Sequence, residues 1–163
     1  MIKIFHITLL ILFSTTYNLK AQDAFSFNDK AIVNSCGHAF LQKISADNQA
    51  DLSIKLDIDM LKINKKINIE ANISAVNIIF IKYSGDNKIV PSICNTQKIE
   101  KANAKALAVF RVISGTIYVK PHKTERRLCT FEFKNLILKN DDNLILELPK
   151  EVFTNVQIGW GVK

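Results

Sequence analysis

The strongest constraint on the fold is an alternation of apolar and polar residues with a period of two. From Asp51 to Met60, leucine, isoleucine and methionine alternate with aspartate, serine and lysine. A β-strand points successive side chains to opposite faces, so this segment predicts a strand with one buried and one wet face. Lys66–Ser74 repeats the pattern, and the short linker 61–65 suggests that the two strands pair as a hairpin.

Further segments extend this β pattern. Val76–Tyr83 is apolar on both parities, which predicts a central strand covered on both faces. The β-branched segment from Ala104 continues past Ser114-Gly115 to Lys120, so we expect a strand there as well. Leu128–Leu138 alternates until its parity slips at Lys134-Asn135, as in a β-bulge. Shorter strands are expected at Phe25–Phe27, Lys88–Ile93, Leu144–Leu148 (stopped by Pro149) and Val156–Trp160, with a loop or short helix after Phe27.

About eight strands joined by short turns leave little room for the crossover helices of a parallel sheet. We therefore predict an all-β protein, an antiparallel β-sandwich of about eight strands. A closed β-barrel is the alternative, because closure also removes exposed sheet edges. The expected core includes Leu56, Ile69, Phe80, Phe110, Phe131 and Leu146.

The first 21 residues have the order of zones that is typical of a secretory signal peptide. Lys3 supplies a positive start, Ile4–Phe13 is almost wholly apolar, and Ser14–Ala21 is polar and ends in a small residue. The apolar run is about half the ~20 residues that a membrane-spanning helix needs. We therefore expect a cleaved signal peptide at 1–21, in preference to a membrane anchor or a buried N-terminal strand or helix.

Cleavage after Ala21, or one residue later, would leave a single β-sandwich domain at 22–163 with no transmembrane segment. The protein is then expected to be secreted, periplasmic or on the cell surface. Loss of Lys3 and Lys20 leaves 20 basic and 15 acidic residues, a net charge of +5. This excess favours an acidic surface, glycan or protein as partner. Nucleic acid is not expected for an exported chain without aromatic residues among its basic ones. The richness in lysine, isoleucine and asparagine suggests a bacterial gene.

The most pointed local feature is a basic loop between two predicted strands. Arginine can hold a phosphate or carboxylate through two hydrogen bonds, and proline before the loop limits its freedom. Glu125 offsets part of the charge, and a solvated loop that keeps the protein soluble is the alternative interpretation. The predicted anion-binding residues are Lys120, His122, Lys123, Arg126 and Arg127.

No motif identifies catalytic residues, a metal site or a cofactor. Cys36-Gly37-His38 brings a thiol near an imidazole, yet no oxyanion-hole motif accompanies the pair. The three cysteines Cys36, Cys94 and Cys129 lack zinc-ligand spacing, and which of them pair is open. Cys129 shares the inward parity of Phe131, so a buried thiol is as plausible there as a bridge. The Asx-rich turns could offer oxygens to calcium, but they are interpreted as ordinary turns.

These features favour an exported, non-enzymatic binding or adhesion module. The alternatives are a small secreted hydrolase or hydrolase inhibitor, and a structural subunit of a surface assembly. A pocket holding His38 with Cys36, or His122 with an acid, would favour the hydrolase. An exposed sheet edge open to strand addition would favour the assembly subunit.

Overall fold

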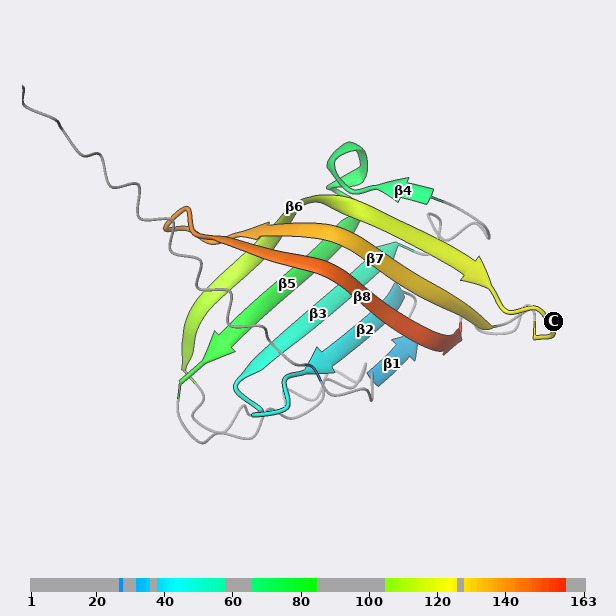
Figure 1. Ribbon diagram of the computed structural model, residues 1–163, viewed down its shortest axis with the longest axis horizontal. Coiled ribbons are helices and arrows are strands. Elements are labelled where there is room, and N and C mark those ends of the chain that lie inside the picture. The colour runs from blue at the N-terminus through cyan, green and yellow to red at the C-terminus, as the bar shows by residue number, and fades with distance from the viewer. Residues whose placement is uncertain are drawn as a thin grey trace, which may run out of the picture.

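The computed structural model describes residues 27, 32–35, 38–57, 66–84, 105–125 and 128–157. This part of the chain is all-β and folds into an antiparallel, strongly curled half-barrel sheet (Figure 1). The predicted fold class is therefore confirmed as all-β and antiparallel. The signal peptide predicted at 1–21 lies outside the described residues.

The sheet follows the order of the chain closely. Its path runs β1-β2-β3-β5-β6-β7-β8, and every pairing along it is antiparallel. Strands that are consecutive in sequence thus lie side by side, as short connections favour. The strands are β1 (Ile32–Ser35), β2 (His38–Ile44), β3 (Ala50–Asp57), β5 (Val76–Tyr83), β6 (Ala106–Pro121), β7 (Leu128–Lys139) and β8 (Ile145–Gln157). Off this path, β4 (Lys66–Asn68) pairs with β6 and is followed by the 3-10 helix η2 (Glu70–Asn72).

The curl begins at a corner shared by β6 and β7. Ser114 faces Ile137 while Thr116 faces Lys134, so β7 carries one extra residue there. This confirms the bulge predicted at Lys134-Asn135, and Asn135 adopts a positive φ of 51°. Gly115 has a φ of 142°, and a Cβ on it would lie 2.8 Å from Cδ2 of Leu136. Glycine is required because both the backbone angle and the close approach of β7 exclude a side chain.

The concave face of the sheet holds a core rich in phenylalanine. The rings of Phe131 and Phe133 stack 6.3 Å apart, and Phe153 meets Phe133 edge to face at 5.7 Å. On the other side of the curl, Phe80 makes edge-to-face contacts with Phe27 and Phe110. Of the predicted core residues, Leu56, Ile69, Phe80 and Phe131 are buried, and Phe110 and Leu146 are partly buried against them.

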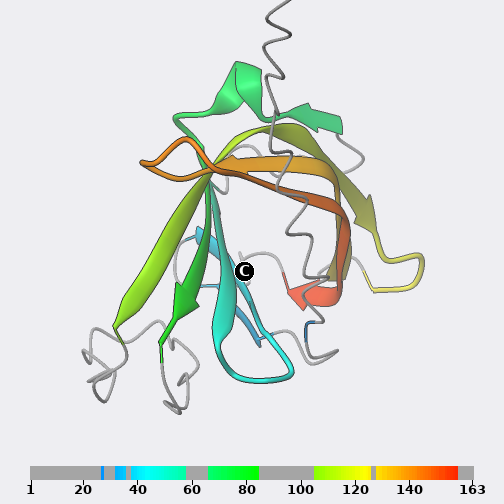
Figure 2. The same cartoon turned by 60° about the vertical axis from the view of Figure 1, so that its left-hand side comes forward.

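The two ends of the sheet come together through side chains. Figure 2 shows the sheet curling so that β8 returns towards β1 and β2, and β1 and β8 are in contact. The Nζ of Lys43 on β2 lies 2.7 Å from Oε2 of Glu151 on β8, with 12% and 13% of the two side chains exposed. The same ammonium group lies 5.0 Å from the ring centroid of Phe153. A nearly buried charge thus acquires both a counterion and an aromatic face where the curl closes.

Two sequence predictions are wrong between residues 66 and 74. The strand is limited to Lys66–Asn68, and it pairs with β6, so the expected hairpin with β3 does not form. After Asn68 the chain turns because Oδ1 of Asn68 accepts a hydrogen bond from the Ala71 N–H. Ile69 is still buried, and its N–H bonds to the carbonyl of Gly115. The alternating pattern therefore predicted correctly that Ile69 faces inward. Its prediction that the strand continues past Asn68 is wrong.

The N-terminal and C-terminal strands also differ from expectation. The loop or short helix expected after Phe27 is replaced by β1 and β2. β8 runs through Pro149, which joins the strand expected at Leu144–Leu148 to Val156. Proline is tolerated there because β8 lies at the end of the sheet path, where its missing N–H breaks no ladder on the outer side. Lys88–Ile93, Ile158 and Trp160 lie outside the described residues, and Phe27 makes a single bridge to Ser45.

The long central strands agree with the sequence. Val76–Tyr83 is β5, a central strand between β3 and β6, as predicted. It is not covered on both faces as expected, because Phe80 is buried inward whereas Ile79 and Ile81 on the other face are only half-buried. The segment after Ala104 forms the single long strand β6 across Ser114-Gly115. Strong periodicity in the sequence thus predicted the strands that lie in the middle of the sheet.

Truncating Phe131 to alanine should lower the free energy of unfolding by about 3–5 kcal/mol, because its ring is fully buried among other rings. Thr130→Ala, on the neighbouring half-buried position, should change it by less than about 1 kcal/mol. Urea unfolding of both variants measures the difference. Equal effects would mean that the inward face of β7 has been assigned to the wrong parity.

Candidate anion-binding face

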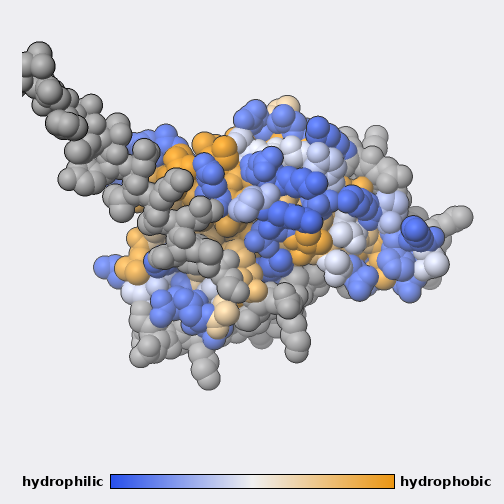
Figure 3. All heavy atoms as spheres, viewed as in Figure 1, coloured by the Kyte–Doolittle hydropathy of each residue, from blue (hydrophilic) through white to orange (hydrophobic). Residues whose placement is uncertain are grey.

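The outward side of β6, β7 and β8 collects lysine side chains. Inward positions of these strands hold apolar residues such as Ile117 and Phe133, so the alternate positions face solvent. Figure 3 shows hydrophilic side chains over the area that these strands occupy in Figure 1. We call this area the lysine face and define it by Lys66, Tyr118, Lys120, Glu132, Lys134 and Lys150.

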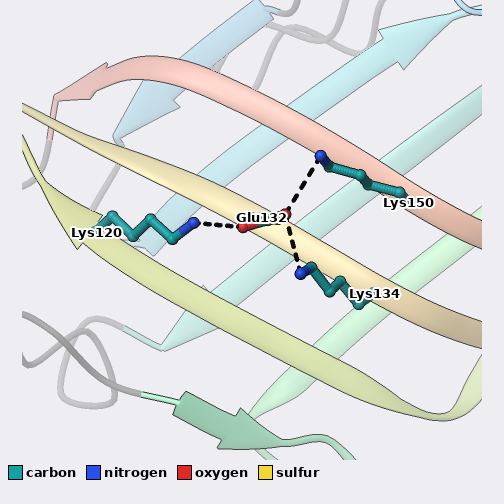
Figure 4. A network of polar contacts seen from close by, with 4 residues as sticks. All are labelled: Lys120, Glu132, Lys134 and Lys150. Carbon is teal, nitrogen blue, oxygen red and sulfur yellow. Dashed lines mark hydrogen bonds and ion pairs between the residues drawn. The ribbon is translucent and has the colours of Figure 1, made fainter.

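A single carboxylate lies at the centre of the lysine face. Lys120 donates a hydrogen bond of 2.5 Å to Oε2 of Glu132. The Nζ atoms of Lys134 and Lys150 lie 3.3 and 3.4 Å from its Oε1 (Figure 4). The Glu132 side chain is only 9% exposed, whereas 59%, 44% and 59% of Lys120, Lys134 and Lys150 are exposed. The carboxylate is thus enclosed by ammonium groups that themselves remain open to solvent.

Strand register explains why these groups converge. Glu132 on β7 faces Tyr118 on β6 and Val152 on β8, two residues away from Lys120 and Lys150. Lys134 follows on the same face of β7 and stands directly opposite Lys150. Like charges opposite each other destabilise a sheet, and the shared carboxylate offsets that repulsion.

The lysines control the protonation state of Glu132. The hydrogen bond from Lys120 is the largest cause, and Lys134 adds to it, so the pKa of the Glu132 carboxyl falls from 4.5 to about 2 although burial opposes the shift. The carboxylate therefore stays ionised below the pH at which an ordinary glutamate is protonated. With four lysines and one glutamate, the lysine face carries a net charge of +3.

Tyr118 adds an aromatic ring to this charged surface. The Nζ of Lys134 lies 5.2 Å from the ring centroid, and the Nζ of Lys66 on β4 lies 5.9 Å from it. Both distances suit cation–π attraction. The ring thus connects Lys66, on the far side of β6, with the lysines around Glu132.

The sequence-predicted site is only partly contained in this face. Lys120 belongs to it, and the exposed residues His122 and Lys123 lie in the adjoining loop. The Nδ1 of His122 accepts a hydrogen bond from the Glu125 N–H at 3.3 Å and lies 3.2 Å from Oγ1 of Thr124, so its ring is engaged within the loop. Arg126 and Arg127 lie outside the described residues.

Lys66, Glu132, Lys134 and Lys150 were not predicted as site residues. They come from three strands and are separated by up to 84 positions in the chain. The shared outward parity of Glu132 and Lys134 was visible in the sequence. The register that brings Lys66 and Lys150 to them depends on β4 pairing with β6 and on β8 passing through Pro149.

Two hollows lie on the described part of the molecule. A hollow of 280 Å³ is lined by Lys55, Asp57, Ser74, Ala75 and Asn77, and one of 250 Å³ by Asn135, Leu136, Ile137, Glu147, Leu148 and Pro149. No histidine or cysteine is among these lining residues. Among the parts of the chain that the structure describes, no three His, Cys, Asp or Glu side chains gather as a metal site.

Cys129 is a buried thiol on the inward face of β7, on the parity predicted for it. Its S–H points to the carbonyl of Val156 at 3.6 Å, and burial raises its pKa to about 12. A thiol with so high a pKa is not a nucleophile at neutral pH. The structure does not describe Cys36, Cys94 or the side chain of His38.

No helix in the described ranges is long and apolar enough to cross a membrane.

The depressed pKa of Glu132 predicts a pH dependence of stability. The stabilisation is complete above the unfolded pKa near 4.5 and is lost as the pH falls towards the folded pKa of about 2. Glu132→Gln should therefore flatten the decline of Tm between pH 5 and pH 2, measured by circular dichroism. Glu147→Gln, at an exposed position of β8, is the control and should leave that decline unchanged. An equal decline in wild type and Glu132→Gln would contradict the ion-pair assignment.

Comparison of the chain with protein-family models, with curated proteins and with solved structures finds no match.

Proposed function

We propose that the protein is an exported, non-enzymatic binding module that holds an anionic partner on its lysine face. The observation that carries this proposal is the excess of positive charge around Glu132. Three ammonium groups from β6, β7 and β8 lie within 3.4 Å of one carboxylate and keep 44–59% of their side chains exposed. A concentrated charge of one sign on an open surface attracts and steers oppositely charged partners.

A purely structural role explains the cluster less well. One lysine is enough to neutralise Glu132, so the second and third lysines are more than charge balance requires. Placing Lys134 opposite Lys150 even costs stability, which the shared carboxylate only offsets. Charges that the fold does not need are more readily explained by binding.

The basic loop extends the proposed site beyond β6. Lys120 is the residue before Pro121, the last residue of β6, so it belongs both to the lysine face and to the start of the loop. His122, Lys123, Arg126 and Arg127 follow, and we include them as the flank of the site. The arginines would add the bidentate contacts that lysine cannot make.

Export is part of the same proposal and is supported by the zones of residues 1–21. It requires a mature chain that begins at Gln22 or Asp23, located in the periplasm, on the cell surface or outside the cell. For the finer architecture of 22–163, the single continuous sheet and the contact between β1 and β8 support the barrel-like alternative more than two facing sheets. The assembly-subunit alternative would use the outer edge of β8, which ends the sheet path.

The double variant Lys134→Gln/Lys150→Gln tests the proposal. Each lost contact to a linear polyanion should reduce the slope of log affinity against log salt by about one unit. Retention on a sulfated matrix should therefore fall steeply, while the thermal midpoint changes little because both side chains are largely exposed. Salt-gradient elution and a thermal melt provide the two measurements.

The matched control is Lys55→Gln/Lys105→Gln, which removes two exposed lysines from β3 and from the segment before β6. Lys66 is unsuitable as a control because it contacts the ring of Tyr118. If both pairs reduce retention equally, only the general basicity of the protein is at work and the site assignment is wrong.

A further inference from the structure

Glu132 occupies the position where a small anion would bind. Lys120, Lys134 and Lys150 all direct their ammonium groups to its two oxygens (Figure 4). In a site built for phosphate or sulfate, such groups would converge on the ligand instead. The carboxylate lies in the strand with only 9% of its side chain exposed, so it is not displaced by rotating into solvent.

A compact anion therefore meets two obstacles on this face. It must take the ammonium groups away from a carboxylate that is fixed between them, and it must approach that negative charge closely. Neither described hollow lies at the cluster, because both are lined by other residues. A single sulfate or phosphate ion gains no enclosure in return for these costs.

An extended polyanion avoids the second obstacle, because its negative groups need not approach Glu132 closely, and it offsets the first by binding several lysines at once. Each lysine has a flexible stem and a largely exposed side chain, so its ammonium group can turn outwards to a separate negative group. The lysines lie on β4, β6, β7 and β8, which spreads them over roughly 15 Å at the usual spacing of strands. Several weak contacts along one chain then add up, since each makes the next one intramolecular.

Tyr118 indicates which polymer fits. Its half-buried ring has the ammonium groups of Lys66 and Lys134 over it, and it becomes an apolar surface for a sugar once those groups turn to the polymer's negative groups. A pyranose ring can pack its C–H face on an aromatic ring while its carboxylate or sulfate groups reach the ammonium groups. A chain of phosphates has charge but no such face.

We infer that Glu132 is a specificity-determining residue that makes the lysine face select an acidic polysaccharide over compact anions. The inference rests on the proposed function and names its ligand class. The Glu132 carboxylate pairs with the ammonium groups and so weakens their binding of small anions. A polymer can bind the same lysines from the solvent side.

The test uses three probes: dextran sulfate, which carries sulfate groups on a sugar polymer; free sulfate, which is the anion alone; and uncharged dextran, which is the polymer alone. Wild-type protein should bind dextran sulfate with an affinity that rises with chain length, measured by isothermal titration calorimetry. Sodium sulfate should compete no better than sodium chloride of equal ionic strength, and uncharged dextran should not bind. Tight binding of a sulfated monosaccharide to the wild type would overturn the inference without any variant.

Glu132→Gln removes the carboxylate and should bind free sulfate at least five-fold more tightly than wild type, while Glu147→Gln should not. Tyr118→Ala should weaken binding of dextran sulfate several-fold but leave binding of polyphosphate unchanged. If Glu132→Gln leaves sulfate binding unchanged, or if Tyr118→Ala affects both polymers equally, the inference fails and the proposed function stands. If wild type and Lys134→Gln/Lys150→Gln bind dextran sulfate equally, the proposed function itself fails.

Discussion

The structure depends on one constraint: a single sheet has to bury its own apolar face. The described residues provide no second layer of secondary structure, so the sheet curls until its concave side is filled. Phe131, Phe133 and Phe153 supply the bulk, and rings of this size contribute strongly to burial. The corner at Gly115 and Asn135 makes the curl possible, because it lets β6 and β7 bend without losing their register on either side.

Because the sheet is curled, its inner face buries apolar side chains and its outer face carries charged ones. The inner face carries most of the apolar burial, so the outer face of β6, β7 and β8 can carry charge. The partly buried pair of Lys43 and Glu151 lies where β8 returns towards β2, and Asp51 on β3 is a further buried charged residue. On the outer face, Glu132 makes a dense group of lysines tolerable by separating charges that would otherwise repel.

Sequence periodicity predicted the strands in the middle of the sheet well. β3, β5, β6 and β7 follow from alternation or from runs of β-branched residues, because each strand keeps one inward parity over stretches of several residues. It failed where local bonding overrides the pattern, as at Asn68, whose side chain starts a turn although Ile69 continues the inward parity. It also failed at Pro149, because whether proline ends a strand depends on whether that strand lies at an edge.

The candidate site was less predictable for the same reason. A basic run such as Lys120–Arg127 is visible in the sequence, but the partners of Lys120 are set by cross-strand register. Glu132 looked like one polar residue on a wet face. Only the pairing of β6, β7 and β8 reveals it as the focus of three lysines.

Chemical-shift mapping of the 15N-labelled mature chain with short dextran sulfate would test the central claim most directly. The account predicts that the amide signals of Tyr118, Glu132, Lys134 and Lys150 shift together and saturate at one ligand concentration, while those of β2 and β3 stay in place. Shifts concentrated around Lys55 and Asn77, or spread evenly over all exposed lysines, would contradict it.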